Sequence, residues 1–217
     1  MSDCLRLDVL VPAAASTTGS ELRESRSRLL KRALAGGGMI LGGGVVLAGL
    51  PRLAVSAPSP AQDVEILNFS LLLEYMESAF FSEASVHGRV RGELLEFVDV
   101  VRGHERAHVA FLRNALGSKA RKRPTFDFGN ATRDPDAFTQ AAVALEDLAV
   151  AAYNGQATNL TKGALASAAK IVSVEARHAG WIRAIAGKNP APNATEVPKT
   201  AAQATEAVNK THFVKVG

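Results

Sequence analysis

Residues 94–112 read LLEFVDVVRGHERAHVAFL, and residues 168–182 read AAKIVSVEARHAGWI. In both stretches apolar residues recur every three or four positions, which predicts amphipathic helices with one buried face. Glutamate and histidine interrupt that face, as Glu105 and His108 in the first stretch and as Glu175 and His178 in the second. Residues three apart project from the same side of a helix, so each Glu-x-x-His pair can converge on one point inside the protein.

Two further segments have the same helical spacing and carry a single glutamate in the middle of the apolar face. These glutamates are Glu74, in a helix expected over about residues 62–87, and Glu146, in the third predicted helix. A second helix is expected over about 90–116, a fourth helix ends near residue 186, and no segment is predicted as a strand. We therefore expect an all-α four-helix bundle.

The connection between the second and third helices, residues 117–134, is too long for a tight turn. Fully extended, its roughly 18 residues span about 60 Å, whereas a helix of about 26 residues is about 40 Å long. We therefore expect a long crossover that runs along the bundle. Asp134 followed by Pro135 predicts the start of the third helix. The bundle is expected to occupy residues 62–187, followed by a tail over 188–217 that packs on its surface.

Four glutamates on the inner faces of one narrow bundle predict a metal centre. Burying four carboxylates without positive charge costs many kcal/mol or keeps several of them protonated, whereas two divalent cations balance them. The only cysteine, Cys4, lies at the N-terminus, so the donors are oxygen and nitrogen. Di-iron and di-manganese carboxylate proteins typically have this ligand set, with one glutamate from each of two helices and Glu-x-x-His from each of the other two. The predicted ligands are Glu74, Glu105, His108, Glu146, Glu175 and His178.

Other polar residues near these positions receive different interpretations. Tyr153 is expected two turns after Glu146 on the inner face of the helix. It is either a hydrogen-bonding neighbour of the metals or an ordinary core tyrosine. Glu77 and Asp147 are expected to face solvent. Surface positions are also expected for three histidines without an apolar setting, namely His87, His104 and His212.

The sequence resembles the ferritin-like domain family that includes the desiccation-related proteins and many exported bacterial proteins. The segments that carry the resemblance are 66–77 (ILNFSLLLEYME), 104–109 (HERAHV), 126–130 (FDFGN), 145–157 (LEDLAVAAYNGQA) and 174–179 (VEARHA). The likeness covers nearly all of residues 63–207. It implies that one metal is held by Glu74, Glu105 and His108 and the other by Glu146, Glu175 and His178. It also implies that Glu105 and Glu175 bridge the two ions.

Residues 1–61 are expected to form an N-terminal export signal or anchor region. A basic stretch at 23–32 runs into an apolar, glycine-rich stretch at 33–50, followed by small residues at 54–57, which is the order of a cleavable leader. A periplasmic or extracellular location follows from this interpretation. The alternative is an uncleaved membrane anchor formed by residues 33–50, since 18 apolar residues reach the lower limit of a membrane span.

Charge gives no support for nucleic-acid binding. The chain has a formal charge of +4, but residues 1–61 hold 7 of its 25 Lys and Arg and only 4 of its 21 Asp and Glu. Residues 62–217 therefore carry 18 basic and 17 acidic side chains, which is close to neutral. The partners expected are metal ions with O2 or peroxide, and a membrane is contacted only through an uncleaved N-terminal segment. Assembly with further copies of the chain is left open.

The expected function is chemistry of two iron ions, or alternatively two manganese ions, with O2 or peroxide. Such a centre suits an oxidase that oxidises Fe(II), or a manganese-catalase-like enzyme, in stress protection. A non-enzymatic alternative is a stress- or desiccation-associated helical protein in which the metals only hold the bundle together. The residues do not choose between iron and manganese.

Overall fold

A computed structural model describes residues 57–215. The predicted export or anchor region falls mainly on residues 1–56, which lie outside the described residues. The long helices are α2 (Pro60–His87), α3 (Glu93–Leu116), α4 (Pro135–Gln156) and α5 (Lys162–Ile185), and a shorter helix, α6 (Ala201–Thr211), follows in the tail. Within residues 57–215, none of the helices combines the length and apolarity needed to cross a membrane.

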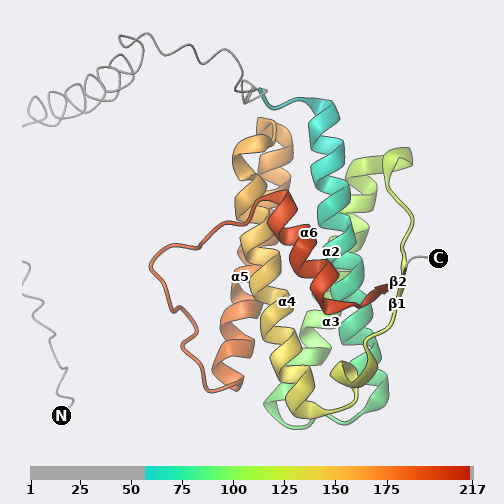
Figure 1. The fold of residues 1–217 in the computed structure, drawn as a ribbon, viewed down its shortest axis with the longest axis vertical. Coiled ribbons are helices and arrows are strands. Elements are labelled where there is room, and N and C mark those ends of the chain that lie inside the picture. Colours follow the sequence, from blue (N-terminus) through green and yellow to red (C-terminus); the bar gives the residue numbers. More distant parts are fainter. Residues whose placement is uncertain (1–56, 216–217) are drawn as a thin grey trace, which may run out of the picture. The chain divides into compact units, whose positions relative to one another are not determined.

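The four long helices pack side by side as a bundle, which confirms the predicted all-α fold (Figure 1). Helix α2 packs mainly on α3, and α4 packs mainly on α5. The connection over residues 117–134 runs along the bundle between the end of α3 and the start of α4, at opposite ends. This crossover makes α2 and α4 antiparallel, so the two helices that carry lone glutamates run past each other in opposite directions.

Local signals in the sequence set the helix ends. The Ser59 hydroxyl accepts a hydrogen bond from the Gln62 N–H, and Pro60 occupies the first turn of α2. Asp134 caps α4 in the same way, with its carboxylate 2.8 Å from the Ala137 nitrogen. Helix α2 ends at Gly88, whose φ of 59° is left-handed and is adopted at little cost by glycine.

The helices differ in how much of their surface is buried. Helices α3 and α5 each bury one stripe of residues spaced three or four apart and expose the rest. Helices α2 and α4 are buried on several faces, because the crossover covers α2 and the tail helix α6 packs on α4. The bundle thus has two central helices and two peripheral helices, and the lone glutamates belong to the central ones.

The crossover is fixed to α2 by side-chain hydrogen bonds. The buried Asn68 side chain donates to the Lys119 carbonyl oxygen at 3.0 Å and accepts from the Arg121 N–H at 2.7 Å. The crossover then forms a short strand, β1 (Thr125–Phe126), which pairs antiparallel with β2 (Val214–Lys215) of the tail. The prediction of no strands was wrong here, because two-residue strands are too short to show an alternating pattern.

The tail approaches α4 closely at a glycine. The Lys199 N–H donates to the Ala151 carbonyl oxygen at 2.9 Å. A Cβ atom on Gly155 would lie 1.7 Å from the Lys199 carbonyl oxygen, so only glycine allows the two backbones to approach this closely. Helix α6 then buries Ala204 and Val208 against the core.

Candidate metal centre

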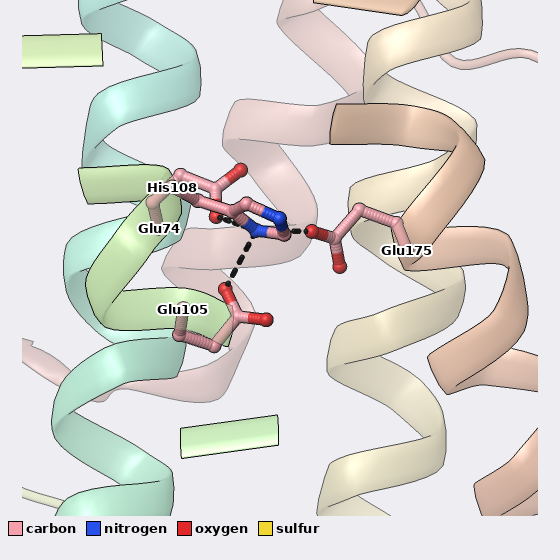
Figure 2. A group of neighbouring side chains, drawn as sticks. All are labelled: Glu74, Glu105, His108 and Glu175. Atoms are coloured by element: carbon pink, nitrogen blue, oxygen red, sulfur yellow. Dashed lines mark hydrogen bonds and ion pairs between the residues drawn. The ribbon is translucent and has the colours of Figure 1, made fainter. Parts of the chain in front are cut away.

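All six predicted ligands lie together in the middle of the bundle. They form two groups that share Glu105 and Glu175: one group adds Glu74 and His108, and the other adds Glu146 and His178. Within each group, one ligand atom from every residue lies within 4.8 Å of the others. Figure 2 shows the first group, with the His108 ring pointing between the carboxylates of the other three residues.

The two shared glutamates each present one oxygen to either histidine. Glu175 Oε1 lies 2.8 Å from His108 Nδ1, and its Oε2 lies 3.5 Å from His178 Nδ1. Glu105 Oε2 lies 3.6 Å from His108 Nδ1, and its Oε1 lies 3.3 Å from His178 Nδ1. A carboxylate with its oxygens divided in this way can bridge two ions. The outer positions belong to Glu74, 3.2 Å from His108 Nδ1, and Glu146, 3.4 Å from His178 Nδ1.

Most of these atoms are close together but are not hydrogen-bonded. Both oxygens of Glu105, Glu146 and Glu175 and the Nδ1 atom of His178 have no hydrogen-bond partner among the described residues. Glu175 Oε1 is near enough to His108 Nδ1 for a hydrogen bond, but the alignment is lacking. Buried polar atoms are normally hydrogen-bonded, so lone pairs that converge without partners fit a site for cations.

Burial and charge strongly perturb the ionisation of the centre. Glu74, Glu105, Glu146 and Glu175 have no exposed surface, and His108 is the most exposed of the six at 9%. Burial raises the pKa of Glu74 and of Glu146 well above the usual value, and for Glu74 the neighbouring negative charges are the next largest cause.

The histidines and one bridging glutamate shift in the opposite sense. Burial opposes the charge on His108 and His178, but the surrounding carboxylates outweigh it and raise the pKa of both rings to about 12. Burial also opposes ionisation of Glu105, yet contacts with His108, His178 and Glu74 lower its pKa to about 2. Without metal, the centre therefore balances its negative charge with protons, and metal ions would replace those protons.

Tyr153 contacts the centre directly. Its hydroxyl donates to Glu74 Oε1 at 2.5 Å, while Glu74 Oε2 faces His108. Tyr153 is therefore both a core tyrosine and a hydrogen-bond partner of a candidate ligand. The Tyr153 ring is buried, so the phenol fixes the orientation of Glu74 from within the core.

His104 was predicted as an ordinary surface histidine, and its setting is different. Its side chain is exposed, but its Nδ1 lies 2.9 Å from His178 Nε2, and the two rings stack with centroids 5.1 Å apart. The Nδ1 atom of His178 faces the carboxylates, so His104 supports the ring from the opposite side. His87 pairs with Glu83 at the end of α2, and His212 is exposed, which agrees with surface positions.

The predictions of solvent-facing Glu77 and Asp147 were wrong. Glu77 is only 1% exposed, because α2 is covered on several faces and a position one helical turn from Glu74 stays inside. Asp147 is half-buried and forms a two-pronged ion pair with Arg183 of α5, at 2.8 and 2.6 Å. This pair ties α4 to α5 beside Glu146.

The donor set fits two divalent ions of the iron or manganese type. Four carboxylates supply four negative charges, two imidazoles supply nitrogen, and no sulfur takes part. The unpaired, converging atoms favour this fit more than the number of acidic residues does. That the six residues bind metal stays a prediction.

Comparison with known proteins agrees with this architecture. A search of curated proteins gave no match to the chain. The sequence profile of the Ferritin-like domain matches residues 62–188, more than half of the 217 residues, and spans α2 to α5 with all six candidate ligands. The chain therefore belongs to the ferritin-like domain family.

Proposed function

We propose that this chain is an exported protein whose bundle holds two iron ions, with two manganese ions as the alternative, and that it acts on O2 or peroxide. The proposal depends on one observation: seven ligand atoms converge in a buried centre without hydrogen-bond partners among the described residues. Such a dimetal pair, when bound, supplies electrons to O2 or peroxide. Oxidation of Fe(II) or removal of peroxide in stress protection would follow.

The residues of the bundle have separate tasks in this proposal. Glu105 and Glu175, which each face both histidines, would contact both ions, and His108 and His178 would each contribute a nitrogen to one ion. Tyr153 orients Glu74 through its hydroxyl. Apolar neighbours such as Leu71 and Ile182 are fully buried and keep bulk water away, which strengthens the electrostatic interactions inside.

Burial of the centre favours small reactants over organic substrates. Among the six ligands only His108 and His178 have any exposed surface, at 9% and 3%. Such limited exposure suits metal ions, O2 and peroxide. His104 is exposed and contacts the Nε2 atom of His178, so it lies on the surface side of that ligand.

The test is the reaction of metal-loaded protein with O2 and with hydrogen peroxide. Wild-type protein loaded anaerobically with Fe(II) or Mn(II) should consume one of the two oxidants with multiple turnovers. The double variant His108→Ala/His178→Ala should lose this activity, whereas the exposed His212→Ala should retain it. Equal rates for the double variant and the wild type would show that the oxidant does not react at this centre.

A second candidate function is purely structural, with metals that hold the bundle together during stress. The complete burial of the four glutamates favours this alternative, because without the ions the core must take up protons or keep unbalanced charge. Thermal unfolding with and without chelator, measured beside turnover, separates the two functions. A large stabilisation by metal with no turnover of either oxidant would support the structural role.

A further inference from the structure

Glu77 is a fifth buried glutamate of the bundle, and it is not one of the six predicted ligands. It lies three residues after Glu74 on α2 and is 1% exposed. Neither of its carboxylate oxygens has a hydrogen-bond partner among the described residues. No Lys, Arg or His within residues 57–215 forms an ion pair with it either, so its charge lacks compensation.

Glu77 lies one helical turn from Glu74, and its electrostatic neighbours are the glutamates of the centre. Residues three apart share a helix face, so Glu77 projects from the same side of α2 as Glu74 but one turn further along. Burial is the main cause that raises the pKa of Glu77 well above the usual value. The negative charges of the other glutamates raise it further, in the order Glu146, Glu175, Glu105 and Glu74. Glu146 on α4 is thus its strongest electrostatic neighbour.

The surroundings of Glu77 offer no other reason to keep a carboxylate there. Its neighbours on α2 include the fully buried Phe80 and Phe81, which belong to the apolar core. A leucine would fill such a place without the cost of an unpaired charge. Buried carboxylates are retained where they are paired or where they coordinate metal, and here the expected cations lie in the adjacent centre.

Counting donors shows that the centre has room for another ligand. Each ion would receive four residues: the shared Glu105 and Glu175, and either Glu74 with His108 or Glu146 with His178. Manganese and iron in oxygen-rich sites commonly take six donors, so positions remain at both ions. We propose that Glu77 is a seventh ligand residue of the centre and completes the coordination of the ion held by Glu146 and His178. This inference rests on the proposed function.

The extra carboxylate also changes the charge that the ligand set balances. Four glutamates match two divalent ions, whereas five ionised glutamates match one divalent and one trivalent ion. As a ligand, Glu77 would therefore stabilise the higher oxidation state of the ion beside it. Glu74 already receives a hydroxyl from Tyr153, so the two ions have different surroundings.

The first experiment is titration of metal-free protein with Co(II), whose visible spectrum reports the number of ligands. Wild-type protein should bind two ions. Glu77→Gln should weaken one of the two binding steps at least about tenfold and change the spectrum of that ion only. The matched control is Glu65→Gln on the same helix, where the carboxylate is exposed, and it should titrate like the wild type.

Two further measurements test the role of Glu77 even if the Glu77→Gln variant misfolds. Glu77→Leu removes the carboxylate and leaves an apolar side chain, and it should fold without metal and show the same loss at one binding step. A crystal structure of the Mn(II)-loaded wild type should place a Glu77 oxygen about 2.0–2.6 Å from the ion beside Glu146.

The outcomes separate this inference from the proposed function. Two ions in the wild type, unchanged titrations of both Glu77 variants and a Glu77 oxygen beyond bonding distance would overturn the role of Glu77 alone. Failure of the wild type to bind Co(II) or Mn(II) would overturn the dimetal centre itself, and the role of Glu77 with it.

Discussion

The two halves of the bundle have the same ligand pattern in different surroundings. Helices α2 and α3 supply a lone glutamate and then Glu-x-x-His, and α4 and α5 repeat this order. Seven residues after the lone glutamate, the second half has Tyr153, where the first half has Phe81. The antiparallel arrangement of α2 and α4 brings the Tyr153 hydroxyl to Glu74, the glutamate of the other half.

Two other differences are polar side chains, Glu77 and His104, that have apolar counterparts and that we relate to the half containing His178. Glu77 follows the lone glutamate of α2 by three residues, and its counterpart on α4 is Ala149. His104 precedes the Glu-x-x-His pair of α3, and its counterpart on α5 is Val174. A nearly symmetric ligand set thus has asymmetric support, so two bound ions should differ in affinity and in the substitutions that affect them.

The largest expected effects come from the ligands themselves. Glu175→Ala removes a carboxylate that faces both histidines and should lose both ions, whereas His108→Ala and His178→Ala should each lose one. Metal counts after dialysis measure this, with the exposed His212→Ala as the control that keeps two ions. If Glu175→Ala also keeps two ions, the carboxylate is not shared between the halves.

Acid should weaken metal binding strongly in both halves. Burial raises the pKa of Glu74 and Glu146, and the surrounding carboxylates raise the pKa of His108 and His178. The metal-free centre therefore holds protons that an ion must displace. Lower pH favours the proton-bound form. Displacement of up to two protons per ion increases the Kd by as much as about 100-fold for each pH unit lost. Competition titrations at two pH values measure the slope, and a Kd independent of pH would contradict the protonation described above.

A smaller and one-sided effect is expected from Tyr153→Phe. Loss of the hydroxyl leaves one oxygen of Glu74 without its hydrogen bond, so the ion in the first half should bind about tenfold more weakly. The second ion should bind as in the wild type. Tyr75→Phe is the matched control, because the Tyr75 hydroxyl donates to the Arg121 carbonyl oxygen at 3.4 Å and not to a candidate ligand. Equal weakening of both ions would show that the two halves do not respond separately.

The smallest effect on metal binding is expected from the tail. A methyl group at Gly155 would collide with the Lys199 carbonyl oxygen, so Gly155→Ala should displace the tail from α4 and reduce the free energy of unfolding by about 1–3 kcal/mol. Both ions should still bind. Gly163→Ala is the control, since no atom lies within 4 Å of its added methyl group. Thermal unfolding compares the variants, and equal midpoints would show that the tail yields without cost.

The peripheral helices explain why most of the site could be predicted from the sequence. Helices α3 and α5 each bury a single stripe, so Glu105, His108, Glu175 and His178 appear as polar interruptions of an apolar pattern. The crossover was predictable because its length exceeds that of any tight turn. These features depend on local periodicity and chain length, which a single sequence contains.

The central helices explain what could not be predicted. Helix α2 is buried on several faces, so no exposed stripe separates the inward Glu77 from a solvated glutamate. The contact of His104 with His178 depends on how α3 lies beside α5, and the pairing of β1 with β2 depends on where the tail returns. Such contacts between distant segments have no local periodic signal.

The most direct test of the dimetal centre is the metal content of the purified protein. The protein is prepared without chelator, loaded anaerobically with iron or with manganese, dialysed and analysed by mass spectrometry for both metals. The converging, unpaired carboxylates and histidines predict about two ions per chain with one metal preferred. Less than about 0.2 ion per chain under both loadings would contradict the centre, because the buried ligands would then be balanced by protons alone.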